Sequence, residues 1–144
     1  LILFNHESEL KTEKFVSRLI TKKSAEIKLG ISNNLHLRNI GAYADFSSAY
    51  DFMEALFKIC EKNIFEDFIL ASGNGTSILS IVENCFDLLN LDIKKHLTFE
   101  LNETLPYLIG DTTKIKKRLA WKPNESINQV IEKMLNIDLH NLKN

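Results

Sequence analysis

Polar side chains that could bind a ligand follow the first apolar run of the chain. The run Leu1–Phe4 shows no polar alternation, which is typical of a buried strand in a parallel sheet. Asn5 and His6 come directly after it, and a helix is expected from about Thr12. In open α/β sheets, ligands bind outside the carboxyl ends of strands, where strand and helix separate. We therefore expect Asn5, His6 and the following loop to lie at a ligand site; an ordinary strand end with a polar turn is the alternative.

The other groups with metal-binding or redox chemistry are poorly spaced for it. His36 stands in a short alternating run with no second ligand at a useful spacing, so we expect a surface histidine and no metal site. Cys60 and Cys85 each fall on the apolar face of a predicted helix. We predict that both are reduced core residues and that they form no disulfide.

The composition is ordinary for a globular domain. The chain has 144 residues, of which 44% are hydrophobic and 26% charged, and its formal net charge is −1. This length suits one domain with a sizeable core. The near-neutral charge argues against nucleic-acid and anionic-membrane partners, and no apolar run approaches the ~18 residues of a membrane span. The short apolar start has no basic leader, so we expect a cytoplasmic protein without a secretory signal.

Apolar runs alternate with amphipathic segments, which predicts a small α/β fold. Strands are expected near residues 1–5, 35–38, 67–71 and 97–101. Helices are expected near residues 12–29, 48–61, 77–89, 111–119 and 126–139. The polar tail 140–144 is expected to fray.

Capping residues mark the ends of these helices. Gly30 is expected to close the first helix as its C′ residue. Thr76 or Ser77, Asp111 and Ser126 are expected to cap the later helices.

Two further features concern turns and packing. The Gly73–Gly75 segment could cradle a phosphate at a strand–helix junction, but a tight turn that needs positive φ explains it better. Trp121 is expected to be buried near Leu119 and the last helix, because Pro123 ends the preceding helix and turns the chain back.

Several motifs resemble those of one family. Leu3–Ser8 (Leu-Phe-Asn-His-Glu-Ser) and Lys14–Arg18 (Lys-Phe-Val-Ser-Arg) are similar to the FNHESPRRG and FVTRKI segments of GDP-mannose 4,6-dehydratases. Ile109–Pro123 resembles the motif GD-x-x-K-A-x-x-x-L-G-W-x-P, Asp45–Ala55 resembles RDWG-x-x-x-DYVEAM, and Ala71–Gly73 resembles ATG. These enzymes are extended short-chain dehydrogenase/reductases that use NADP and GDP-mannose. The order and spacing of the motifs cover almost the whole chain, from residue 1 to about 139.

The resemblance implies a Rossmann-type α/β fold, of which this chain is the C-terminal substrate-binding lobe with the dinucleotide-binding domain missing. Residues 1–139 would form that lobe, and residues 1–5 would be the last part of the nucleotide-domain sheet. By motif match, His6 and Lys11 take the positions that contact NADP. Asn5, Val16 and Arg18 take positions that border the nucleotide-sugar substrate.

The chain lacks two catalytic features of that family. Its glycines never form the dinucleotide fingerprint. The catalytic Tyr-x-x-x-Lys is also missing, because the residues four positions after Tyr43, Tyr50 and Tyr107 are Ser47, Glu54 and Asp111. With no base and no hydride carrier, we expect no catalytic residue, no bound NADP and no redox chemistry from this chain alone.

Several basic residues of the family are replaced. The Pro-Arg-Arg is Glu9-Leu10-Lys11, the lysine of FVTRKI is Leu19, the basic pair before Asp-Trp is Tyr43-Ala44, and a loop arginine falls near Leu101. In the family, several of these cations hold the cofactor phosphate or the GDP diphosphate. Each such contact is worth ~1.5–3 kcal/mol, so losing three weakens binding by roughly three or more orders of magnitude.

Two hypotheses follow. The chain is either the sugar-nucleotide side of a GDP-mannose 4,6-dehydratase-like enzyme, or a diverged non-catalytic module that pairs with a full-length enzyme or has lost function. The start at Leu1, inside a strand, suggests a portion of a longer protein. An interior strand cut from its sheet exposes edges and apolar side chains. We therefore expect Leu1–Phe4 to self-associate, to meet a missing N-terminal domain, or to re-dock on the lobe.

Overall fold

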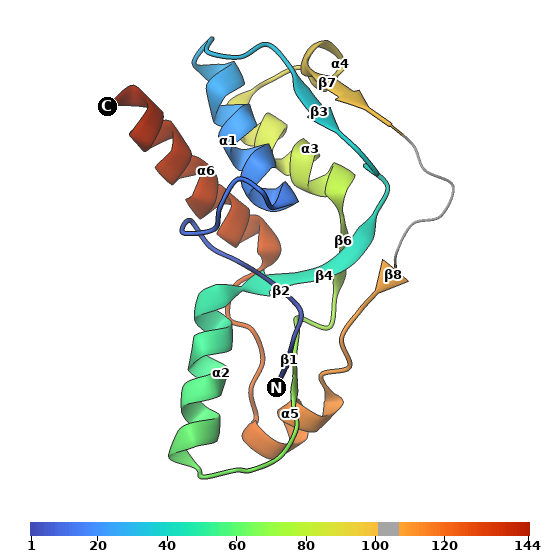
Figure 1. The fold of residues 1–144 in the computed structure, drawn as a ribbon, viewed down its shortest axis with the longest axis vertical. Helices are drawn as coiled ribbons and strands as arrows, with labels where there is room; N and C mark the ends of the chain where they lie inside the picture. Colours follow the sequence, from blue (N-terminus) through green and yellow to red (C-terminus); the bar gives the residue numbers. More distant parts are fainter. Residues whose placement is uncertain (101–106) are drawn as a thin grey trace.

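The computed structural model describes residues 1–100 and 107–144. Figure 1 shows two helical parts with strand β4 running between them. The strands are β1 (Ile2–Leu3), β2 (Asn5–Glu7), β3 (Leu35–Leu37), β4 (Tyr43–Ser48), β5 (Ile69–Leu70), β6 (Gly75–Ser77), β7 (Leu97–Phe99) and β8 (Tyr107–Leu108). The helices are α1 (Val16–Lys28), α2 (Ala49–Glu61), α3 (Ile78–Leu89), α4 (Ile93–His96), α5 (Thr113–Leu119) and α6 (Ile127–Lys143).

The first apolar run and the polar motif after it belong to two different sheets. Strand β1 pairs in parallel with β5, whereas β2 pairs in parallel with β4. Strand β4 also pairs antiparallel with β6 and parallel with β8. A separate parallel pair joins β3 to β7. The α/β class is confirmed, and the expected strand near 1–5 is two strands with different partners.

The larger core lies among α1, α3 and α6, which pack together on one side of β4 (Figure 1). Residues at helical spacing face one another there, among them Ile20, Ile81 and Ile131, which are fully buried. The predicted caps are confirmed at Gly30, whose positive φ of 73° ends α1, and at Ser126, whose side chain forms a capping box at the start of α6. Ser77 caps α3 through a bond to the Ser80 amide.

The smaller core joins α2, α5 and β5 around Trp121. The indole of Trp121 is 1% exposed, and its ring meets Phe52 edge-on with centroids 6.4 Å apart. Phe68 and Leu119 belong to the same cluster. The predicted burial of Trp121 beside Leu119 is confirmed. Its main partner is α2, and not the last helix, because the α6 side chains face the larger core.

Two helix ends differ from the sequence prediction. Helix α1 begins at Val16, since turns that bond Lys11 to Ser8 and Phe15 to Thr12 occupy the expected first turn. Helix α6 continues to Lys143, so residues 140–143 are helical in the structure. Lys143 lies in its last turn, where its positive charge complements the helix dipole.

The prediction that both cysteines are core residues is wrong for one of them. Cys85 is buried, whereas Cys60 is exposed and both thiols are free. Cys60 shares an exposed apolar stripe of α2 with Met53 and Phe57, which neither core covers. The apolar pattern therefore predicted helix α2 correctly but not the environment of Cys60.

One strand was not predicted and another is shorter than predicted. The segment after Asn39, for which no strand was predicted, forms β4 and carries the central pairing of the structure. The strand expected near 97–101 is β7, which ends at Phe99. Leu101 and the loop that follows it lie outside the described residues.

Among the described helices, none has both the length and the apolar character that a membrane crossing requires.

Candidate ligand site at the end of β1

A cavity of about 440 Å³ opens beside β1 and β2, where the sequence predicted a ligand site. Its wall is mainly apolar, with polar groups from the predicted site residues. The lining residues are Ile2, Leu3, Phe4, Asn5, His6, Lys11, Phe15 and Leu108. Three of the five predicted site residues, Asn5, His6 and Lys11, therefore lie together.

Backbone contacts hold Asn5 and His6 in place. The Asn5 amide nitrogen Nδ2 donates to the backbone carbonyl of Asp45 at 2.9 Å, across the β2–β4 pair. The His6 ring places Nδ1 3.0 Å from the Phe4 carbonyl and packs against Phe52, with centroids 5.5 Å apart. The side-chain oxygen of Asn5 and the second ring nitrogen of His6 are the groups left to meet a ligand.

Lys11 is tied to a buried carboxylate that the sequence prediction missed. Glu7 is fully buried, and its Oε1 accepts from Lys11 Nζ at 2.7 Å. The hydroxyl of Ser17 donates to the other oxygen of Glu7, and Lys11 also donates to the His6 carbonyl at 3.2 Å. The ammonium lies 4.4 Å from the Phe15 ring centroid. Lys11 therefore brings little uncompensated charge to the cavity. The sequence feature that could have predicted the role of Glu7 is its place inside the Asn-His-Glu-Ser motif.

Val16 and Arg18 point to other parts of the structure. Arg18 Nη1 lies 2.7 Å from Asp138 Oδ2, and both side chains are almost fully covered. Burial raises the pKa of Asp138, although the Arg18 guanidinium opposes that shift. Val16 packs against the larger core. The structure therefore does not bring these two residues to the cavity that Asn5, His6 and Lys11 share.

Asp45 is a structural residue that the sequence prediction also missed. Its carboxylate accepts from the amides of Ser72 at 2.8 Å, Gly73 at 2.8 Å and Gly110 at 3.2 Å, and from the Ser72 hydroxyl at 2.6 Å. It joins the loop after β5 to the segment before α5. Gly73 has φ of 76°, so the prediction of a tight turn is confirmed.

Asp51, the second aspartate of the motif that begins at Asp45, has a similar role. It accepts from the backbone amides of Asn124 at 3.1 Å and Glu125 at 3.2 Å. These bonds fix the segment between α5 and α6 to the start of α2. Both aspartates thus organise loops, and neither lines the cavity beside β1.

Tyr43, one of the two residues in the place of the basic pair before Asp45, stacks on a distant tyrosine. The rings of Tyr43 and Tyr107 stack with centroids 5.0 Å apart and an interplanar angle of 8°. Gly75 allows this arrangement, because a Cβ there would lie 1.9 Å from the Tyr43 ring. Leu19, at the position of the family lysine, packs against the larger core. The position near Leu101 lies outside the described residues.

The turn at Ser72 and Gly73 is not free to bind a diphosphate through its backbone N–H groups. A diphosphate is usually bound by backbone N–H groups of a glycine-rich turn at a helix N-terminus. In this chain the amides of Ser72 and Gly73 are already bonded to Asp45. Within the described ranges, no cluster of three or more His, Cys, Asp or Glu side chains could hold a metal ion.

Comparison with known proteins identifies the family of the chain. The family model described as GDP-mannose 4,6 dehydratase matches residues 1–134. The chain belongs to the GDP-mannose 4,6-dehydratase family. GDP-mannose 4,6 dehydratase 1 of Arabidopsis thaliana is 32% identical over 142 residues, which cover 96% of this chain and 39% of that protein. The human GDP-mannose 4,6 dehydratase is 31% identical over 159 residues, with 96% and 43% covered.

Solved structures show the same fold. RMD from Pseudomonas aeruginosa, complexed with NADPH, superposes with a TM-score of 0.89 at 19% identity and covers 96% of this chain and 47% of its own. The dTDP-glucose 4,6-dehydratase of Bacillus anthracis, in complex with NAD, gives 0.83 at 15% identity, with 98% and 44% covered. The chain thus spans less than half the length of these relatives, and it matches their C-terminal portion.

Proposed function

We propose that this chain forms the sugar-nucleotide side of a GDP-mannose 4,6-dehydratase-type site. In the family, that reaction converts GDP-mannose to GDP-4-keto-6-deoxymannose. The observation that carries the proposal is the cavity at the end of β1, where Asn5, His6 and Lys11 converge. The three residues come from the motif by which the chain resembles the family.

Asn5 and His6 are assigned different ligands in this proposal. Asn5 already donates through Nδ2 to Asp45, so its oxygen is the group that accepts from a sugar hydroxyl. His6 borders the nicotinamide end of NADP, and Lys11 shapes the same wall through its bond to Glu7. Arg18 borders the sugar nucleotide only if its pair with Asp138 opens, and Val16, which packs against the larger core, supports the wall from behind without lining the cavity.

NADP and the catalytic base come from outside this chain in the proposal. The chain has neither the glycine fingerprint nor the Tyr-x-x-x-Lys pair, and its glycine turn is bonded to Asp45. Strand β1 is the natural contact for the missing part, since Ile2 and Leu3 are about half exposed although β1 pairs with β5. Without that part, we expect these residues to drive self-association.

A chimaera tests the proposal. The N-terminal portion of the Arabidopsis relative is joined ahead of Leu1, and conversion of GDP-mannose is followed by chromatography. We expect formation of the 4-keto product, and at least a tenfold lower rate for Asn5→Ala than for the surface control Asn128→Ala. NADP binding by the chimaera shows that its nucleotide domain is folded. A chimaera that binds NADP but makes no product contradicts the proposal.

A second candidate is a diverged, non-catalytic module. The observation that favours it is the replacement of cations by Leu19, Tyr43 and Ala44, with the Tyr43 ring stacked on Tyr107. These replacements remove charge from the diphosphate side of the proposed site. A folded chimaera that binds NADP but neither binds nor converts GDP-mannose would support this alternative.

A further inference from the structure

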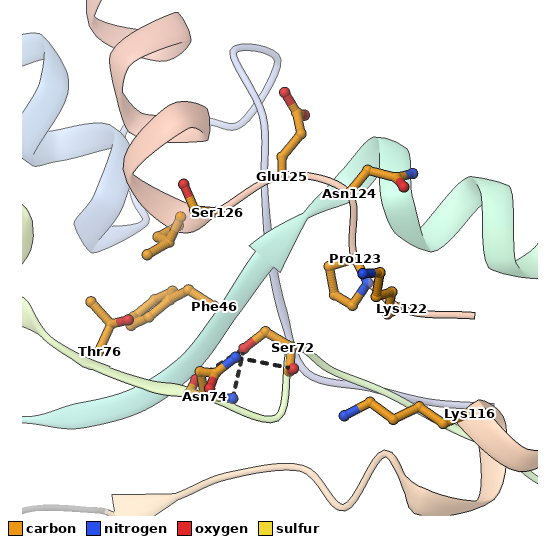
Figure 2. A pocket seen from close by; sticks show the side chains of 11 residues that line it. Phe46, Ser72, Asn74, Thr76, Lys116, Lys122, Pro123, Asn124, Glu125 and Ser126 are labelled. Carbon is orange, nitrogen blue, oxygen red and sulfur yellow. Dashed lines mark hydrogen bonds between the residues drawn. The ribbon is translucent and has the colours of Figure 1, made fainter. Parts of the chain in front are cut away.

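A second cavity, of about 460 Å³, lies between the loop after β5 and the segment that joins α5 to α6 (Figure 2). None of its lining residues belongs to the cavity beside β1. Phe46, Pro123 and Ile127 form apolar wall, and Ser72, Asn74 and Thr76 supply hydroxyl and amide groups. Its volume is in the range of small-ligand sites, roughly 300–1,000 Å³.

Two lysines give this second cavity its charge. Lys116 comes from α5 and Lys122 from the segment after it, and neither makes an ion pair with a carboxylate of the described residues. Figure 2 shows the Lys116 side chain extending from α5 toward the turn of Ser72 and Asn74. Two ammonium groups at one apolar-walled cavity favour an anion with one or two negative charges.

The acidic and amide residues at the rim are bonded elsewhere. Glu125 contacts Lys133 and accepts from the Ser48 hydroxyl at 3.1 Å. The Asn124 side chain donates to Asp51 at 3.1 Å and to Glu54 at 2.6 Å. In Figure 2 both side chains extend away from Lys116. They therefore do not neutralise the two lysines.

The opposite rim is rigid. The Ser72 hydroxyl accepts from the Asn74 amide at 3.0 Å, and the Asp45 carboxylate anchors the whole turn. On the other rim, Ser126 lies at the start of the 17-residue helix α6, whose N-terminal dipole adds positive potential to the cavity. Little ordering is then needed when a ligand enters, which favours affinity.

We propose that this second cavity binds a small organic phosphate, with the phosphate between Lys116 and Lys122 and the carbon body against Phe46 and Pro123. Lysine is a common point-charge partner of phosphate, and the apolar wall adds contact that a bare anion cannot use. The class includes sugar phosphates and nucleoside monophosphates. The site is separate from the proposed dehydratase site, so either can fail without the other.

Calorimetry on the 144-residue chain tests this proposal with three probes: adenosine monophosphate, glucose 6-phosphate and inorganic phosphate. We expect at least one organic phosphate to bind more tightly than inorganic phosphate. The double variant K116Q/K122Q should lose about 100-fold in affinity, since each charge-assisted contact is worth about tenfold or more. The charge-matched control K94Q/K95Q, on α4, should bind as the unmodified chain does.

The probes also separate the two sources of the phosphate. Tighter binding of adenosine monophosphate indicates a nucleotide, and tighter binding of glucose 6-phosphate indicates a sugar phosphate; both support the proposal. Circular dichroism checks that each variant is folded. The proposal is overturned if no organic phosphate binds, if inorganic phosphate binds equally well, or if K94Q/K95Q weakens binding as much as K116Q/K122Q.

Discussion

Removing the Asp45 carboxylate should destabilise the chain strongly. The side chain is fully buried and receives the amide N–H groups of Ser72, Gly73 and Gly110. In Asp45→Ala these three donors lose their charged acceptor, at ~1–3 kcal/mol for each group left unsatisfied. Ser72 is half-buried, so water can replace part of that loss. We therefore expect Asp45→Ala to lower the free energy of unfolding by about 3–5 kcal/mol.

Urea unfolding, followed by the fluorescence of the single tryptophan, measures this loss. Asp111→Ala is the matched control, because that exposed carboxylate accepts one backbone N–H, from Thr113 at 2.9 Å, and is expected to cost about 1 kcal/mol. Asp45→Asn should fall between the two, since the amide keeps an acceptor oxygen but turns an N–H₂ group toward donors. A loss below 1 kcal/mol for Asp45→Ala would show that the carboxylate does not organise these loops.

Three further predictions concern packing, thiol reactivity and pH. Trp121→Ala should cost ~3–5 kcal/mol in a denaturant titration read by circular dichroism, and a cost under 1 kcal/mol would show that the ring is not core. A thiol reagent should label Cys60 quickly and Cys85 only on unfolding, because burial raises the pKa of the Cys85 thiol to about 12; equal rates would contradict the burial. Burial raises the pKa of Asp138, so its contribution to stability is present below its unfolded pKa and is lost as the pH rises through the folded pKa. Asp138→Asn should therefore increase the gain in unfolding free energy between pH 4 and pH 7. Glu66→Gln should reduce that gain, because Arg118 and Lys114 lower the pKa of Glu66. A change of the gain in the same direction in both variants would refute this.

Local signals explain what could be predicted from the sequence. Gly30, Ser77 and Ser126 each end or begin a helix through bonds to residues a few positions away, and the sequence shows both partners. The burial of Trp121 follows from its large apolar ring at a helix end followed by proline. The motif around Asn5 and His6 identified both the cavity and the family.

Non-local partners explain what could not be predicted. Strand β4 contains Asp45, Ser47 and Ser48, which look like loop residues until the carboxylate of Asp45 meets amides 27 to 65 residues away. The first apolar run splits because Ile2 pairs with Ile69 whereas Asn5 pairs with Phe46. No pattern within the run itself reveals that division.

The burial of Lys11 and the exposure of Cys60 have the same kind of cause. Lys11 looks like a free surface cation, yet the fully buried Glu7 and the Ser17 hydroxyl form a closed network with it. Cys60 looks like a core residue because its helix face is apolar, yet no described element covers that face. Periodicity identifies a face, and only the tertiary arrangement decides what meets it.

Calorimetry with GDP-mannose tests the central claim most directly. We expect no low-micromolar binding by the 144-residue chain alone, because cations of the family are replaced in it and the nucleotide domain of its relatives is not part of it. The chimaera that carries the N-terminal portion of the Arabidopsis relative should bind GDP-mannose, although the replaced cations keep its affinity below that of the relative. Asn5→Ala should weaken that binding ~3–10-fold, as expected for one neutral hydrogen bond. Low-micromolar binding of GDP-mannose by the chain alone would contradict the account. So would a folded chimaera whose affinity for GDP-mannose is unchanged by Asn5→Ala.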